Sequence, residues 1–203
     1  MDQLSFFDDT ESYRFPEKLL EFEPHFVGNE EATALKALLI TTTNWQQTTI
    51  KMYDKILPTP RLIAWYGDSG SAYNLGGQKT DVLPWTPELY DLKQRIEHYS
   101  GQTFNSVLLN YYRNGNDSVA WHRDKEHELG NRPVIASLSL GQTRNFDFRA
   151  VNNHSNKYSI PLTNGALLLM KGDLQVNWEH RIAKAPKLTM PRINLTFRLV
   201  NIR

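Results

Sequence analysis

Residues 191–200 read Pro-Arg-Ile-Asn-Leu-Thr-Phe-Arg-Leu-Val, an alternation of polar and apolar side chains that predicts a β-strand. Successive side chains on a strand point to opposite faces, so Arg192, Asn194, Thr196 and Arg198 share one face. Two arginines inside a small barrel are costly unless an anion neutralises them. Their Cα atoms would lie about 20 Å apart and each side chain reaches about 6–7 Å, so both guanidinium groups could hold one small dicarboxylate. The alternative is an edge strand with two solvent-facing arginines.

The same period of two recurs through the C-terminal half of the chain, in short runs separated by Gly, Asn or Pro. The runs are SVLLNYY (106–112), PVIASLSLG (133–141), NFDFRAV (145–151), KYSIPL (157–162) and GALLLMK (165–171). Strands without intervening helices indicate a barrel or jelly roll rather than a doubly wound α/β sheet. Two helices precede them, one capped by Asn29 and one from Thr86 to about Tyr99. We therefore expect a mainly β fold with flanking helices (α+β), a double-stranded β-helix or jelly-roll barrel.

The 203 residues are expected to form one domain. Residues 1–15 predict a loosely held acidic arm, residues 16–105 hold the helices and an irregular segment, and residues 106–203 form the jelly-roll core. The irregular segment, WYGDSGSAYNLGGQKTD (65–81), is too polar for a core and too aromatic for an idle linker. No apolar run approaches the roughly 18 residues of a membrane span, and a signal-peptide pattern is absent. The expected location is therefore intracellular and soluble, in the cytoplasm or, in a eukaryote, the nucleus.

The amino-acid composition limits the kinds of metal site and catalysis that the chain can support. Cysteine is absent, which excludes disulfides, zinc-thiolate sites, iron–sulfur clusters and thiol catalysis, so any metal must be held by imidazole and carboxylate. The net charge of +1 hides an asymmetry, because residues 1–31 carry nine acidic and two basic side chains and the remainder carries +8. A basic body suits a polyanion such as nucleic acid, although an acidic arm and a basic barrel can also be two solvated surfaces.

His122 and Asp124 form a possible metal-binding pair. Residues i and i+2 of an extended segment point to the same side, so both can reach one ion. His180, in VNWEHRIAK, is the best candidate for a third ligand. Two histidines and a carboxylate occupy one face of an octahedral iron and leave positions open for other molecules. The H-x-D pattern alone is weak, and His180 could equally be packed at a strand end beside Trp178.

Asn110 and Tyr112 form a second same-side pair that could supply neutral donors. The order N-x-Y, H-x-D, distal H and R-x-N-x-T-F-R resembles that of the AlkB family of nucleic-acid dealkylating dioxygenases. PRLIAWYGD (60–68), GQTFNSVLLNYY (101–112), VIASLSLG (134–141) and PRINLTFR (191–198) are similar especially to the animal DNA- and RNA-repair members. The likeness covers roughly residues 58–200.

The resemblance implies an enzyme that uses Fe(II), with 2-oxoglutarate and dioxygen as cosubstrates. It implies that the iron ligands are His122, Asp124 and His180. It also implies cosubstrate contacts: Arg192 to the far carboxylate, assisted by Asn110 and Tyr112, and Arg198, helped by Asn194, to the carboxylate beside the keto group.

The resemblance further implies that residues 61–85 form a nucleotide-recognition lid. Tyr73 matches a tyrosine that lines the base pocket, and Glu126 matches an acidic position facing the exocyclic amine of the target base, although Glu126 could also be a surface charge. Leu75 departs from the family pattern, because the repair enzymes carry a stacking aromatic ring there. Either Leu75 gives a weaker wall, or Trp65 or Tyr66 substitutes for the ring.

The implied reaction is oxidative demethylation of N-alkylated bases, such as 1-methyladenine and 3-methylcytosine, with release of formaldehyde, succinate and CO2. The expected partner is single-stranded DNA, double-stranded DNA or RNA, with no membrane, and the expected assembly is a monomer. The rivals are the same chemistry on a protein or other substrate, a non-catalytic binding module, and a zinc enzyme. Glu126 and the basic body favour bases, and Leu75 leaves room for the first rival.

Overall fold

Eight strands between Ser106 and Arg198 make up a jelly roll. The computed structural model describes residues 18–52, 54–69, 73–75, 78–80, 82–125 and 127–201, and the expected arm at 1–15 lies outside them. The strands pair antiparallel in a nested order, with the first strand pairing with the last and each inner strand with its counterpart. The four pairs are β7 (Ser106–Tyr112) with β14 (Arg192–Arg198), β8 (Val119–His122) with β13 (Trp178–Ile182), β9 (Ile135–Gly141) with β12 (Leu167–Met170), and β10 (Arg144–Ala150) with β11 (Lys157–Leu162). This nesting defines the double-stranded β-helix that the sequence predicted.

The pairs are divided between two sheets. One has six strands in the order β1-β12-β9-β14-β7-β4, because β1 (Leu20–Glu23) and β4 (Leu62–Gly67) extend its two edges. The other has four strands in the order β11-β10-β13-β8. Strand β14 is central in the larger sheet, with β9 on one side and β7 on the other.

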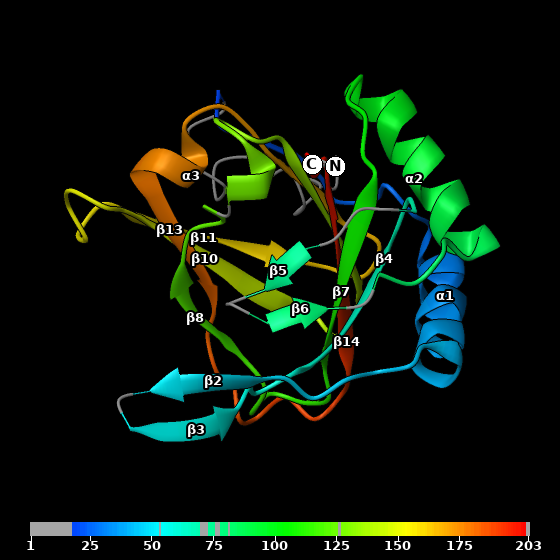
Figure 1. Cartoon of the computed structure of the whole chain (residues 1–203), viewed down its shortest axis with the longest axis horizontal. Coiled ribbons are helices and arrows are strands. Elements are labelled where there is room, and N and C mark those ends of the chain that lie inside the picture. The colour runs from blue at the N-terminus through cyan, green and yellow to red at the C-terminus, as the bar shows by residue number, and fades with distance from the viewer. Residues whose placement is uncertain are drawn as a thin grey trace, which may run out of the picture.

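Two helices, α1 (Asn29–Thr42) and α2 (Pro87–Ser100), cover the larger sheet (Figure 1). The ends of α2 follow the sequence signals: the Thr86 side chain accepts a hydrogen bond from the Leu89 N–H, and Gly101 ends the helix with φ +66°. The start of α1 differs from expectation. Its cap is Gly28, without a side-chain hydrogen bond, and Asn29 is already the first helical residue. Among the helices in the described part of the chain, none combines the length and apolarity that a membrane span requires.

The segment expected to be irregular contains strands. Trp65, Tyr66 and Gly67 belong to β4, and beyond it β5 (Tyr73–Leu75) and β6 (Gln78–Thr80) form a separate two-stranded sheet. The prediction missed β4 because both of its faces are buried, so the strand lacks the alternation that reveals a half-exposed one. Another two-stranded ribbon joins β2 (Thr49–Met52) and β3 (Lys55–Pro58).

The core has two apolar layers. One lies between the two sheets and contains side chains from both, such as Leu168 of the larger sheet and Phe148 of the smaller. The other lies between the larger sheet and the helices and includes Ile193, Leu195 and Phe197 of β14. The apolar face of β14 is therefore turned toward the helices, and its polar face is turned toward the space between the sheets. Two short helices complete the described elements, η2 (His127–Leu129) and α3 (Leu174–Asn177).

Candidate active site

The polar face of β14 lines a cavity between the sheets. Arg192, Asn194, Thr196 and Arg198 all border it and all are at most 9% exposed. The inward orientation predicted from the alternation is confirmed, and the alternative of a solvent-facing edge strand is wrong. The cavity measures about 110 Å³, several times the roughly 30 Å³ that one water molecule occupies in the liquid. It is therefore large enough for a small metabolite.

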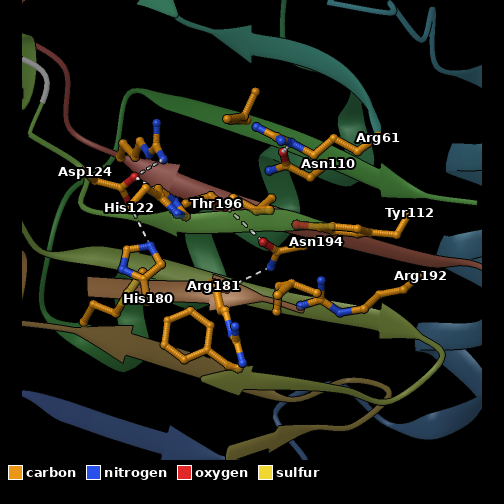
Figure 2. A pocket seen from close by; sticks show the side chains of 17 residues that line it. Arg61, Asn110, Tyr112, His122, Asp124, His180, Arg181, Arg192, Asn194 and Thr196 are labelled. Carbon is orange, nitrogen blue, oxygen red and sulfur yellow. Dashed lines mark hydrogen bonds and ion pairs between the residues drawn. The ribbon is translucent and has the colours of Figure 1, made fainter. Parts of the chain in front are cut away.

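The cavity brings His122, Asp124 and His180 together at one end (Figure 2). Antiparallel pairing of β8 and β13 places His122 opposite His180, with ring centroids 4.2 Å apart. The Asp124 carboxylate lies between them, 3.7 Å from Nε2 of His122 and 3.9 Å from Nε2 of His180. One ligand atom from each residue lies within 4.8 Å of the other two. The three residues selected from the sequence thus form one cluster.

The local contacts favour the protonation states that a metal ion requires. Nδ1 of His122 donates a hydrogen bond to the carbonyl oxygen of Ala120 at 2.9 Å, which directs Nε2 toward Asp124, 3.7 Å away. Burial, together with the charges of His122 and Arg198, lowers the pKa of His180 to about 3 despite the attraction of Asp124. His180 is therefore neutral at physiological pH, as a metal ligand must be.

Asp124 is ionised although it is buried. Burial by itself raises the pKa of a carboxyl group, but the surrounding positive charge, that of Arg198 above all, holds the pKa of Asp124 below its ordinary value. The nearest cation is Arg198, whose Nη2 lies 3.2 Å from Oδ1 of Asp124. Arg198 is thus at the same end of the cavity as the metal-binding group.

Arg192 lies at the opposite end of β14 from Arg198. It contacts side chains on the two neighbouring strands of the larger sheet, β9 and β7. Its Nη2 donates to Oγ of Ser139 at 2.8 Å, and its guanidinium lies 5.1 Å from the centre of the Tyr112 ring. Within the described residues, Nε and Nη1 of Arg192 have no hydrogen-bond partner. Burial is the main reason that the pKa of Arg192 is lowered to about 10, and the group is still a cation at neutral pH. A buried cation with two free donors is suited to bind an anion.

The middle of the cavity holds two oriented amides. Asn194 donates through Nδ2 to Oγ of Ser137 at 2.8 Å. Oδ1 of Asn110 accepts from Nε of Arg61 at 2.7 Å, which turns the amide nitrogen of Asn110 away from that contact. Asn110 and Tyr112 line the same cavity, as the sequence predicted (Figure 2).

Two further arginines in or beside the cavity were not selected from the sequence. Arg61 lines the cavity from the residue just before β4, so its position depends on the pairing of β4 with β7. Arg144 is 3% exposed and lies behind Tyr112, 5.7 Å from its ring centre. Nη2 of Arg144 donates to the carbonyl oxygens of Asp117 and Ala183, which joins two loops across the end of the barrel. Neither arginine belongs to a local pattern, so only the assembled fold identifies them.

The expected base-binding residues have different outcomes. Tyr66 packs in the layer beneath the helices, on the opposite face of the larger sheet from the cavity, so the expectation that it could stack on a base is wrong. Trp65 is on the cavity side but only 1% exposed, with its ring 5.9 Å from the guanidinium carbon of Arg198, so it offers no open face to a base. The described part of Tyr73 and Leu75 is their backbone, in β5. Glu126 lies outside the described residues.

The donor set fits one transition-metal ion. Two imidazoles and one carboxylate form the 2-His-1-carboxylate triad of non-haem Fe(II) oxygenases. Zinc sites of the structural type use four protein ligands, often with thiolates, and this chain has no cysteine. The cavity continues from the triad toward Arg192, so there is room beside the metal position for a further ligand. The fold and the site together define a jelly-roll protein of the non-haem iron oxygenase class.

Comparisons with known proteins agree with this class. Residues 20–198 match the model of the 2OG-Fe(II) oxygenase superfamily. Mouse alpha-ketoglutarate-dependent dioxygenase alkB homolog 3 is 41% identical over 185 residues, which cover 87% of this chain and 64% of that protein, and its human counterpart is 42% identical with the same coverage. Human DNA oxidative demethylase ALKBH2 is 36% identical over 74% of this chain and 60% of its own length. A solved structure of OsALKBH1 superimposes with a TM-score of 0.62 at 17% identity, covering 92% of this chain and 99% of the other, which supports the fold.

The chain therefore belongs to the 2OG-Fe(II) oxygenase superfamily. Membership implies Fe(II), 2-oxoglutarate and dioxygen, and the cluster of His122, Asp124 and His180 provides a matching group of metal ligands. The chain spans about two thirds, 64%, of the length of the two homolog 3 relatives given above.

Proposed function

We propose that this chain catalyses the Fe(II)- and 2-oxoglutarate-dependent oxidative demethylation of N-alkylated bases in DNA or RNA. The observation that carries the proposal is the cavity itself, with a two-histidine, one-carboxylate cluster at one end and a buried arginine at the other. Bound iron would supply the oxidation, in which one atom of O2 enters succinate and the other enters the methyl group that leaves as formaldehyde. The protein side chains contribute binding, orientation and the exclusion of water.

The charges of the cavity favour a small dianion. Arg61, Arg181, Arg192 and Arg198 border it, and Asp124 is the one carboxylate among its described lining residues. Arg181 is paired with Asp147, which does not line the cavity. The other three cations against one anion leave a positive excess in a poorly hydrated space, and a dicarboxylate would neutralise it. 2-Oxoglutarate has two carboxylates at opposite ends and therefore matches arginines at opposite ends of β14.

Each cosubstrate contact follows from the position of a side chain. Arg192 would pair with the far carboxylate through the donors that Ser139 leaves free. Tyr112 lies beside Arg192, and Asn110 lines the same cavity with its amide nitrogen outside the bond to Arg61, so both would assist. Arg198, next to Asp124, would bind the carboxylate beside the keto group, with help from Asn194 on the same strand.

A methylated base is the proposed substrate because the relatives with 36–42% identity include a DNA oxidative demethylase and alkB-homologous dioxygenases. A base must leave its stack to reach a buried metal, and a methylated base that cannot pair is easier to extrude. Tyr73 and Leu75, on β5, are the proposed walls of the base pocket, and Glu126 is the proposed contact to the exocyclic amine. All proposed metal and cosubstrate contacts come from one chain, so a monomer would suffice, acting in the cytoplasm or nucleus where nucleic acid is available.

The decisive experiment incubates the protein with Fe(II), 2-oxoglutarate and oligonucleotides that each carry one methylated base, in single-stranded DNA, double-stranded DNA and RNA. Mass spectrometry should show loss of one CH2 unit from 1-methyladenine or 3-methylcytosine, with one succinate formed per methyl group removed. Reactions with Asp124→Ala, or without 2-oxoglutarate, serve as controls and should leave the oligonucleotide unchanged. Succinate formation without any change in the oligonucleotides would retain the chemistry and reject nucleic acid in favour of a protein or another substrate.

A further inference from the structure

Gln175 is a buried amide that contacts the backbone of a metal-binding residue. It lies in the short helix α3 and is 2% exposed. Its Oε1 accepts a hydrogen bond from the backbone N–H of Asp124 at 2.9 Å, and its Nε2 donates to Sδ of Met170 at 3.6 Å. The carboxamide is therefore engaged at both ends, and its orientation is fixed.

Asp124 requires support from outside its own segment. Strand β8 ends at His122 and η2 begins at His127, so Asp124 lies in neither a helix nor a strand. Its N–H is buried and is satisfied by a side chain instead of a sheet ladder. A buried N–H without a partner costs about 1–3 kcal/mol, so this bond restricts the backbone conformations open to Asp124. The direction of the carboxylate depends on that backbone.

Helix α3 makes further contacts with the part of the chain between β8 and β9. Nη1 of Arg123 donates to the carbonyl oxygen of Val176 at 3.2 Å, and Nε of Arg132 lies 2.6 Å from Oδ1 of Asp173, the cap of α3. The helix then leads directly into β13, which carries His180. One short stretch, residues 174–182, therefore both supplies one candidate metal ligand and holds the backbone of another.

We propose that Gln175 is a positioning residue for the metal centre, which holds the backbone of Asp124 so that the carboxylate faces His122 and His180. The inference rests on the proposed function, because it presupposes that these three residues bind iron. It assigns Gln175 no contact with metal, cosubstrate or base. Its role is to keep the three ligands in place before the metal arrives, and residues that support metal ligands in this way contribute about 10- to 100-fold to metal affinity.

The test measures Mn(II) binding to purified metal-free protein, by the electron paramagnetic resonance signal of the unbound ion. Gln175→Met preserves the length and approximate volume of the side chain and removes the acceptor, and we expect a dissociation constant about 10- to 100-fold higher. Gln175→Asn keeps an amide that is one methylene too short to reach Asp124, and should also weaken binding. Gln175→Glu keeps an acceptor oxygen and should recover most of the affinity. Gln142→Met is the matched control, since it removes a half-buried amide at the turn between β9 and β10, and should bind Mn(II) like the parent.

Thermal unfolding of the metal-free variants separates positioning from general packing. A purely structural role would lower the unfolding temperature of Gln175→Met and leave the Mn(II) dissociation constant unchanged, and that result would overturn the inference. Equal affinity of the parent, Gln175→Met and Gln175→Asn would do the same while leaving the proposed function intact. Failure of the parent to bind Mn(II) would instead reject the metal centre, and with it both proposals.

Discussion

Arg192→Met is expected to weaken cosubstrate binding and to stabilise the ligand-free protein. The side chain of Arg192 is 1% exposed, with a hydrogen bond to Ser139 and two donor nitrogens that have no partner within the described residues. Methionine fills a similar length without bringing a charge into the cavity. The two effects have opposite signs, so a variant that is merely misfolded cannot reproduce them.

The size of the stability effect follows from the pKa of Arg192. Burial lowers this pKa to about 10, and each unit of lowering represents about 1.4 kcal/mol. The charged guanidinium therefore costs the folded state on the order of 3 kcal/mol. Because the folded pKa lies below the unfolded one, stability rises with pH between the two values, and the cost is present in full at neutral pH. Arg192→Met should remove much of it, as replacement of buried charges by apolar groups often does.

The size of the binding effect follows from the bonds that are lost. A hydrogen bond to a charged group contributes about 1.5–3 kcal/mol, so losing one raises the 2-oxoglutarate requirement about ten- to hundredfold. The assay is thermal unfolding with Mn(II) across a 2-oxoglutarate titration, in which the parent gains about 2.7 kcal/mol at a concentration 100 times its dissociation constant. Arg149→Met, which removes a half-buried arginine paired with Glu179 on β13, is the control and should respond to 2-oxoglutarate like the parent. Unchanged cosubstrate dependence in Arg192→Met would refute the assignment of Arg192.

Three further outcomes are expected. Asp124→Asn should lower Mn(II) affinity by more than the roughly 100-fold that follows from loss of a residue supporting a metal ligand. Mn(II) titration measures the affinity, and a dissociation constant equal to that of the parent would show that Asp124 is not a metal ligand. His180→Gln should reduce the acid sensitivity of the metal-free protein, because the unfolded chain takes up a proton as pH falls below about 6.5, whereas folded His180, with a pKa of about 3, does not. The free energy of unfolding of the parent should therefore fall with decreasing pH in this window, by up to about 1.4 kcal/mol per pH unit from this group. Denaturant unfolding from pH 7 to 4 measures this dependence, and a substitution of an exposed histidine, His154→Gln, is the control. Parallel pH curves for the parent and His180→Gln would contradict the prediction. Leu75→Phe should tighten binding of a methylated single strand by the roughly 1–3 kcal/mol that base stacking contributes. Turnover of 2-oxoglutarate in the absence of nucleic acid should not change. Fluorescence anisotropy measures the affinity, and an affinity equal to that of the parent would show that Leu75 does not line the base pocket.

The parts of the site that could be predicted depend on local patterns. The alternation of residues 192–198 determines which side chains of β14 share a face, and the cavity contains the four that were expected. The H-x-D spacing places His122 and Asp124 on one side of an extended segment. His180 was the best candidate for the third ligand, and the resemblance to the AlkB family supported that choice. Helix α2 was predictable for a similar reason, since Thr86 and Gly101 mark its two ends.

The parts that could not be predicted depend on pairing between distant segments. β4 was read as irregular because it is covered on both faces, by the helices and by the layer between the sheets, so it has no polar face. That misreading placed Trp65 and Tyr66 in a base-binding segment, where neither ring is available. Arg61 and Gln175 lie 49 and 51 residues along the chain from their partners Asn110 and Asp124, and a local window of sequence does not reveal such contacts.

The two faces of β14 explain how the fold tolerates a cavity that contains mostly positive charge. Ile193, Leu195 and Phe197 are completely buried beneath the helices, and burial of each contributes about 1.5–3 kcal/mol. Hydrogen bonding to β9 and β7 holds the strand along both edges. The position of the strand is therefore secured by its apolar face and its backbone, independently of the arginines on the other face. Arg192, whose pKa is lowered by burial, can then remain at an electrostatic disadvantage until an anion binds, and the relief of that disadvantage adds to the affinity for a dicarboxylate.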